Sequence, residues 1–221
     1  MNQPESWDKI YETIPPRETR EHKENVIKQL NEFLPENMEW KYVLDYWCGS
    51  GHLWEYIMGK WAYVDFAEIS STMVDLLMKK YSYSDEKTLD WKESFWQTKV
   101  FKVESPSDIP VENWTYDYII AWSVLHHINP DSWKKFLDWF SELLKSGGKM
   151  IITWWDESDV VLKQDWFKWR VTWQPTYTIN ELPKFLYKEK CEIEKTWVYS
   201  EQLLAFEIPR MFRYFVIKKK N

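Results

Sequence analysis

The chain has 221 residues and a formal net charge of −6, with its acidic and basic residues mixed along the length. This balance provides no basic stripe for a nucleic acid, and no apolar run approaches the roughly 20 residues that a membrane helix needs. Because Cys48 and Cys191 are the only cysteines, a disulfide framework and a cysteine metal cluster are excluded, and we expect reduced thiols in a cytoplasmic protein.

The first half of the chain predicts alternating helices and strands. A polar lead-in over residues 1–40 contains one helix, Glu21–Leu34, with its apolar side chains at helical spacing. Later elements are a strand beginning at Val43, a helix over His52–Met58, a strand over Ala62–Ala67 and a helix over Ser71–Tyr81. Ser70 or Ser71 is expected to cap the last of these helices.

The second half continues this alternation and adds strands at its end. We expect strands at Lys99–Val103, Tyr116–Trp122, Met150–Trp154, Glu192–Val198 and Phe212–Lys219, and helices at Asp131–Leu144 and Thr178–Lys188. Ser146, Gly147 and Gly148 are expected to end the first of these helices. Residues 156–177 are irregular and aromatic. The pattern predicts an α/β fold: a Rossmann-like, seven-stranded, mostly parallel sheet with helices on both faces and an antiparallel last strand.

The segment V-L-D-Y-W-C-G-S-G, residues 43–51, predicts a buried strand, a glycine turn and a following helix. Open α/β sheets usually hold a nucleotide-like cofactor at such a turn. Gly49 and Gly51 let the backbone pass close to a ligand, and amides at the start of the following helix favour an anion. Trp47 stands where a tight turn ordinarily needs a residue without a Cβ.

Tryptophan is unusually frequent in this chain and glycine unusually rare. There are 17 Trp and 5 Gly, whereas ordinary usage would give roughly 15 Gly in this length. Several tryptophans occupy positions where a turn residue is expected: Trp47, Trp61, Trp114 and Trp197. One hypothesis is that several of these codons are UGA, written as Trp but translated as Gly in the source organism. The alternative is a genuinely aromatic-rich protein, in which Trp7, Trp139 and Trp169 look like true tryptophans.

Five segments, in this order and at this spacing, carry a family resemblance. They are D-Y-W-C-G-S-G (45–51), E-I-S-S-T-M (68–73), D-I-P-V (108–111), Y-D-Y-I-I-A-W-S-V-L-H-H-I (116–128) and L-L-K-S-G-G-K (143–149). Together they resemble the class I S-adenosylmethionine-dependent methyltransferases, the broad group that includes the ubiquinone/menaquinone-biosynthesis enzymes. The resemblance implies a methyltransferase (EC 2.1.1.-) whose cofactor is S-adenosyl-L-methionine.

The resemblance also implies how the domain is divided along the chain. It gives one domain over 1–221, with an N-terminal helical cap (1–40), a cofactor-binding core (41–154) and a substrate-side loop with the C-terminal strands (155–221).

Several site residues follow from matching positions in the family. Asp45 engages the amino end of the cofactor, and Trp47, Cys48, Gly49 and Gly51 line the turn around it. Glu68 accepts the ribose hydroxyls, a role for which Asp65 is the rival. Ile69 and Met73 flank the adenine, although both are equally typical of a hydrophobic core.

Further candidates lie outside these two strands. Glu104 or Ser105 contacts the adenine amino group, where the family often has an Asp-Ala pair, and Asp108 belongs to the loop itself. Trp122 and Ser123 face the methionine part of the cofactor. Tyr11, in a W-D-x-x-Y segment, hydrogen-bonds the methionine carboxylate or simply packs on the sheet.

Adjacent histidines follow the fourth strand, and they invite a catalytic or metal role. His126 and His127 are the candidates for a direct catalytic role, but both also fit the start of a helix, from which only one of them can point into a cleft. Without suitably spaced Cys, Asp or Glu partners they make a poor metal site, so no metal is expected.

The acceptor is not specified by any motif. Residues 1–35 and the aromatic stretch 155–177, which includes Trp155, Trp166, Phe167, Trp169, Arg170 and Tyr177, are expected to select it. A small molecule is the main expectation, with no membrane partner. A tRNA wobble-uridine acceptor is an alternative, because the segment that ends in His126 and His127 resembles that of some tRNA wobble-uridine methyltransferases. Aromatic side chains also stack RNA bases. A non-catalytic binding protein is another, should Trp47 block the cofactor. A nicotinamide-dependent oxidoreductase is disfavoured, because Trp54 replaces the third glycine of its phosphate-binding motif.

Overall fold

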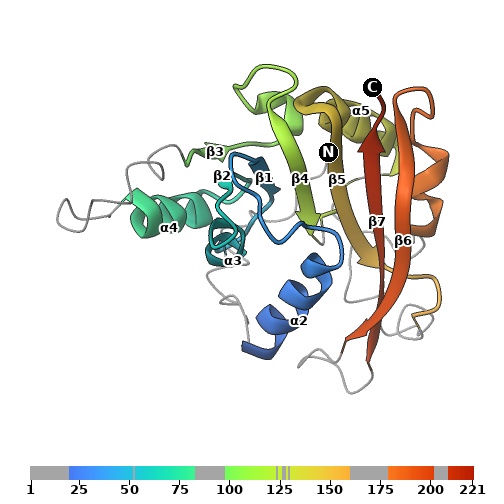
Figure 1. Ribbon diagram of the computed structural model, residues 1–221, viewed down its shortest axis with the longest axis horizontal. Coiled ribbons are helices and arrows are strands. Elements are labelled where there is room, and N and C mark those ends of the chain that lie inside the picture. The colour runs from blue at the N-terminus through green and yellow to red at the C-terminus, as the bar shows by residue number, and fades with distance from the viewer. Residues whose placement is uncertain are drawn as a thin grey trace. The chain divides into compact units, whose positions relative to one another are not determined.

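The computed structural model describes residues 20–51, 53–82, 98–122, 124–125, 128, 130–159, 179–201 and 209–221. The chain divides into two compact units, Met1–Pro110 and Val111–Asn221. Both are drawn in Figure 1, where the colour follows the chain from blue to red.

The first unit is a three-stranded parallel sheet with its helices. Its elements are α2 (Arg20–Asn31), β1 (Tyr42–Tyr46), α3 (Trp54–Met58), β2 (Tyr63–Glu68), α4 (Ser71–Ser82), β3 (Val100–Lys102) and a short 3-10 helix at Pro106–Asp108. β2 pairs in parallel with β1 on one side and with β3 on the other. All residues of β1 and β2 but the first of each are buried. Such burial is typical of parallel strands covered on both faces.

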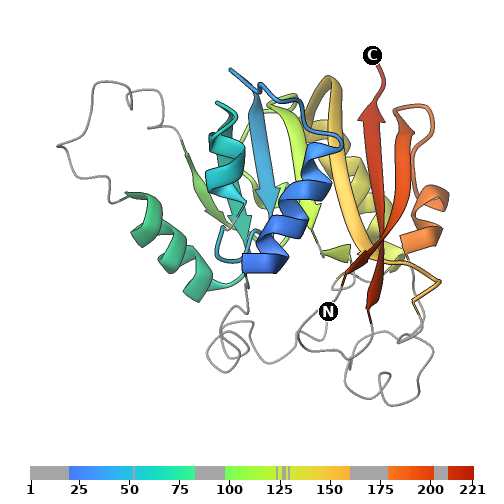
Figure 2. The ribbon, with the colours of Figure 1, turned by 60° about the horizontal axis from the view of Figure 1, so that its bottom comes forward.

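Helices cover this small sheet. Both α3 and α4 contact β2, and α4 runs beside β3 (Figure 2). The Ser70 hydroxyl accepts a hydrogen bond of 3.2 Å from the amide of Met73. Of the two serines proposed as the cap of α4, Ser70 is therefore the one that satisfies a free amide of the first turn.

The second unit contains the longer strands. Its elements are β4 (Tyr116–Trp122), a 3-10 turn at Pro130–Ser132, α5 (Trp133–Leu143), β5 (Leu144–Trp155), a 3-10 helix at Ile179–Lys184, β6 (Cys191–Glu201) and β7 (Arg210–Lys219). β4 and β5 pair in parallel, whereas β7 lies antiparallel between β5 and β6 (Figure 1). The predicted class is confirmed: an α/β fold with seven strands, mostly parallel, and an antiparallel last strand.

The predicted end of α5 was wrong. The helix stops at Leu143, before the glycines, and β5 begins at once at Leu144 instead of at Met150. The glycines lie inside β5, where the pairing with β4 shifts register between Tyr116 and Tyr118. Gly147 has a φ of 72°, and a Cβ at Gly148 would lie 2.9 Å from the carbonyl oxygen of Lys145. These glycines therefore form a bulge in a strand and do not cap the helix.

The helix predicted over Thr178–Lys188 was also wrong in type and length. Residues 179–184 form a 3-10 helix that contains Pro183. Proline has no amide hydrogen and clashes with the preceding turn of an α-helix, so only a short, tight turn forms there. β6 is longer than predicted and runs from Cys191 to Glu201.

None of the helices within the described ranges is both long enough and apolar enough to cross a lipid bilayer.

Candidate functional site

The turn after β1 is built from residues in the left-handed region. Trp47, Gly49 and Gly51 have φ values of 55°, 55° and 70°. The Trp47 amide donates to the carbonyl of Ala67 at 2.6 Å, and the Gly51 amide donates to the carbonyl of Cys48 at 2.9 Å. The turn is thereby attached to the end of β2 and closed on itself.

Glu68, the last residue of β2, holds this turn from the side. Its Oε2 accepts a hydrogen bond of 2.8 Å from the amide of Gly49. Its Oε1 accepts bonds of 2.8 Å from the amides of Ile69 and Ser70. Glu68 is therefore directed at the turn.

The Glu68 carboxyl is buried, with 1% of the residue exposed. Burial raises the pKa of Glu68 above its usual value, and the three amides together with Lys102 offset part of that rise. Two opposing effects act on this pKa: the loss of water raises it, and the hydrogen bonds from the amides lower it.

Asp65, the rival acidic residue, lies on the other face of β2. Successive residues of a strand point to opposite faces, so residues three apart do so as well. The Asp65 carboxylate accepts a hydrogen bond of 3.0 Å from the amide of Lys99, beside β3. Of these two carboxylates, Glu68 is the one that contacts the glycine turn.

Open space lies over the turn at Gly49. A Cβ at this position would meet no heavy atom within 4 Å. Asp45 is buried close by, with 2% exposed. Burial, together with the charges of Asp45 and Glu68, raises the pKa of the Cys48 thiol well above its usual value. The turn thus combines an open glycine backbone, two carboxylates and a neutral thiol, which suits a polar ligand with hydroxyl and ammonium donors.

Trp47 occupies this turn in a conformation that strains it. A left-handed backbone costs an L-residue about 1–2 kcal/mol. The half-buried indole stacks on the ring of Tyr46, with 6.0 Å between centroids and planes tilted by 15°. The conflict expected from the sequence is therefore present in the backbone, while the ring itself packs on Tyr46.

The loop after β3 has the arrangement predicted for Asp108. Asp108 Oδ2 accepts hydrogen bonds from the amides of Glu104 and Ser105, at 2.9 and 2.8 Å. The exposed Glu104 side chain and the half-buried Ser105 are thereby placed on a defined turn. Ile69 is half-buried, whereas Met73 is 3% exposed and packs in the core.

The second unit contributes fewer of the predicted residues. Trp122, at the end of β4, packs edge-on against Tyr214 with 5.1 Å between centroids. Of the other predicted site residues, Tyr11, Ser123, His126 and His127 lie outside the described residues. So do most of the residues expected to select the acceptor: Trp166, Phe167, Trp169, Arg170 and Tyr177. Trp155 is described and ends β5.

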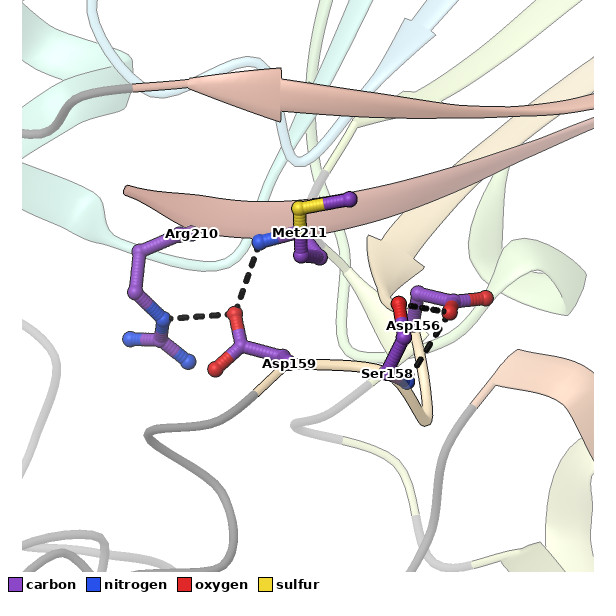
Figure 3. A network of polar contacts seen from close by, with 5 residues as sticks. All are labelled: Asp156, Ser158, Asp159, Arg210 and Met211. Atoms are coloured by element: carbon purple, nitrogen blue, oxygen red, sulfur yellow. Dashed lines mark hydrogen bonds and ion pairs between the residues drawn. The ribbon is translucent and has the colours of Figure 1, made fainter. Parts of the chain in front are cut away.

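A buried ionic network after β5 was not foreseen from the sequence. Asp159 and Arg210 are both fully buried and pair at 2.7 Å through the arginine Nε (Figure 3). The same Asp159 oxygen accepts a 2.8 Å bond from the Met211 amide. The Arg210 guanidinium also lies over the Trp155 ring, with its Cζ 3.9 Å from the centroid. This network fixes the turn that follows β5 to the start of β7.

A second acid strengthens the same turn. Asp156 accepts hydrogen bonds from the Ser158 amide and hydroxyl (Figure 3) and from Arg213 Nε at 2.5 Å. Burial alone would raise the pKa of Asp156, but these donors outweigh it and hold the pKa below its usual value. The only sequence signal was a D-E-S-D run directly after an apolar strand, which by itself names no partner.

Within the ranges that the structure describes, no three His, Cys, Asp or Glu side chains gather as they would to hold a metal ion.

Comparisons with known proteins agree with this geometry. A family model described as "Methyltransferase domain" matches residues 17–190. No curated protein matches the sequence. A structure from Methanosarcina mazei, described as a SAM-dependent methyltransferase, is similar with a TM-score of 0.63 and 16% identity, over 87% of this chain and 96% of that one.

Other solved structures share the fold at low identity. A SAM-dependent methyltransferase from Aquifex aeolicus gives a TM-score of 0.56 and 18% identity over 88% of each chain. Phosphoethanolamine N-methyltransferase 2 of Haemonchus contortus, solved with S-adenosyl-L-methionine, gives 0.65 and 16% over 89% of this chain and 53% of that one. These likenesses support the fold, and the family match covers most of the chain. The chain belongs to the methyltransferase domain family, and its fold is that of the S-adenosylmethionine-dependent methyltransferases.

Proposed function

We propose that this protein transfers a methyl group from S-adenosyl-L-methionine to a small-molecule acceptor. The observation that carries the proposal is the hydrogen bond from the Gly49 amide to Glu68, which links the turn after β1 to the end of β2. The space next to Gly49 is open, because a Cβ there would meet no heavy atom within 4 Å. In open α/β sheets, ligands bind outside the carboxyl ends of the strands. The family match supports methyl transfer as the chemistry at this edge.

The cofactor contacts divide between the two strand ends. In this proposal Asp45 binds the amino group of the cofactor, and Glu68 accepts a ribose hydroxyl at Oε2, the oxygen that accepts one amide where Oε1 accepts two. Gly49 and Gly51 allow the close approach of the backbone, with Trp47 and Cys48 beside them. The buried carboxylates fit a ligand that brings its own donors, because such donors replace lost water.

The remaining contacts complete the proposed site. Ile69 and Met73 flank the adenine, and Glu104 or Ser105 contacts its amino group. Trp122 and Ser123 face the methionine portion, and Tyr11 hydrogen-bonds its carboxylate. These assignments rest on the family resemblance.

Alignment and exclusion of water are the proposed sources of catalysis. The cofactor supplies an electrophilic methyl group on a sulfonium, and its displacement is in-line. Holding two reactants in line provides about 7–11 kcal/mol in the best intramolecular cases. A base is required only for an acceptor that must lose a proton first, and His126 and His127 are the candidates for that task.

A small molecule is favoured as the acceptor over tRNA. The chain has a net charge of −6, whereas binding to nucleic acid depends on neutralising phosphates. We further propose that the chain acts as a single domain in the cytoplasm. The family match extends across both compact units, and both cysteines are free and buried.

The test supplies S-adenosylmethionine labelled on its methyl group with either a low-molecular-weight cell extract or bulk tRNA. We expect the label to enter the small-molecule pool. Salt-sensitive transfer to tRNA would instead establish the RNA alternative. If no label enters either the small molecules or the tRNA, and calorimetry detects no binding of S-adenosylhomocysteine, the protein is better described as a non-catalytic binding protein on the same scaffold.

A further inference from the structure

We infer that Trp40, Trp47, Trp61 and Trp114 occupy positions that are glycine in the protein as its organism makes it, because their codons are UGA translated as glycine. The inference rests on backbone conformation and exposure, and it is independent of the proposed function.

The backbone singles out these positions. Among the residues that the structure describes, the non-glycine residues with positive φ are Trp40, Trp47, Trp61 and Trp114, at 64°, 55°, 68° and 63°. Left-handed residues other than glycine are normally enriched in Asn and Asp, and a bulky side chain there is an outlier. Tryptophan makes up 17 of 221 residues, yet it fills all of these positions. The shared property is a conformation that glycine adopts without cost.

Local hydrogen bonding identifies the turns that demand glycine. The Lys41 amide donates to the carbonyl of Met38 at 2.9 Å, which places Trp40 third in a four-residue turn. A positive φ at the third position is typical of glycine-containing turns. Trp61 follows the end of α3, where its amide donates to the carbonyl of Met58 at 2.8 Å. Left-handed residues after a helix are usually glycine.

Exposure points in the same direction for three of the four. Trp40 is 65% exposed, Trp61 59% and Trp114 67%. An indole gains stability by burial, so three indoles left in water at strained turns contribute little to the fold.

Tryptophans in regular structure have a different environment. Trp133 in α5 is 1% exposed, and its indole nitrogen donates to the carbonyl of Ile128 at 3.0 Å. Trp197 stacks on Tyr214 with 4.8 Å between centroids and 7° between planes. It lies inside β6, so its assignment to a turn position was wrong and we consider it a true tryptophan. Trp40 was not among the turn positions expected from the sequence.

For the cofactor turn the consequence is direct. With glycine at position 47 the segment becomes D-Y-G-C-G-S-G, with glycine at each of its three left-handed positions. The strain at Trp47 and the indole next to the proposed cofactor both disappear.

The first test reads the gene and the natural protein. We expect UGA at codons 40, 47, 61 and 114, UGG at codons 133 and 197, and peptides from the source organism with the mass of glycine at the first four positions. UGG codons, or tryptophan-containing peptides at these four positions, would overturn the inference. Neither the codons nor the peptide masses depend on cofactor binding. A result that overturns this inference therefore leaves the proposed function untouched, and the reverse also holds.

The second test compares Trp61→Gly with Trp61→Ala in thermal unfolding. Both variants remove the exposed indole, but only glycine removes the Cβ that disfavours a positive φ. We expect the glycine variant to unfold about 2–4 °C above the alanine variant. The same pair at Trp197 serves as control, and there alanine should be the more stable because the position is in a strand. An alanine variant at position 61 as stable as the glycine variant would contradict the inference.

Discussion

Glu68 connects the ends of two neighbouring strands through a single side chain. Its oxygens accept amides from the turn after β1 and from the start of α4. Each carboxylate oxygen has two lone pairs. Oε1 accepts two amides and Oε2 accepts one, so one acceptor position remains, on Oε2, for a hydroxyl of a ligand. One residue therefore shapes the turn and, in our proposal, binds the ribose.

The raised pKa of Glu68 makes a prediction about stability and pH. Below the unfolded-state pKa the carboxyl is protonated in both states, so Glu68 adds no pH dependence there. As the pH rises from the unfolded-state pKa to the higher folded-state pKa, the unfolded chain releases this proton before the folded protein does, so stability falls across this window. In urea unfolding, Glu68→Gln should therefore gain stability relative to the unmodified protein between the two pKa values. Glu39→Gln, at an exposed position, is the control; a pH-independent difference for Glu68→Gln would contradict the assignment.

The strands and helices themselves were predictable where the sequence pattern is local. The burial of β1 and β2 follows from short apolar runs, and Ser70 precedes an amphipathic helix. The glycines at 147 and 148 were misassigned because a helix cap and a strand bulge use the same residue type. The two are distinguished by the carbonyls of Lys145 and Asp117 next to Gly148, and the pairing of β4 with β5 brings the second of these near.

The bulge in β5 predicts unequal effects at two adjacent glycines. Gly148→Ala places a Cβ 2.9 Å from the Lys145 carbonyl oxygen and 3.1 Å from that of Asp117. Overpacking of this kind costs about 1–3 kcal/mol. Gly147→Asn should cost less, because asparagine tolerates a left-handed φ and the nearest atom lies 3.8 Å away. Urea unfolding measures both, and equal losses would argue against the bulge.

The ionic network after β5 predicts a large loss of stability when one partner is removed. Asp159→Ala leaves the Arg210 charge buried without its carboxylate, which costs about 3–5 kcal/mol in comparable buried pairs. Replacing both residues with apolar ones, as in Asp159→Leu with Arg210→Met, should restore most of the stability that Asp159→Ala loses. A double variant no more stable than Asp159→Ala would show that the pair is not the source of the loss. Chemical denaturation monitored by circular dichroism provides the measurement.

At the scale of the whole molecule, the candidate site was more predictable than the network. Gly49 and Glu68 are 19 positions apart, in consecutive elements of one strand-helix-strand unit. Asp159 and Arg210 are 51 positions apart. Their pairing depends on β7 returning antiparallel beside β5, and no local pattern reveals that neighbour. For the same reason, the sequence predicts a cofactor site at this edge of the sheet but no acceptor.

The most direct test of the account is isothermal titration calorimetry with S-adenosylhomocysteine on the Trp47→Gly protein. We expect one molecule bound per chain, with the dissociation constant raised roughly 10- to 100-fold by Glu68→Gln, as for a lost hydrogen bond to a charged group. Glu39→Gln should leave it unchanged. No heat of binding with the Trp47→Gly protein, or the same affinity after Glu68→Gln, would contradict the claim that the turn after β1 and the end of β2 hold the cofactor.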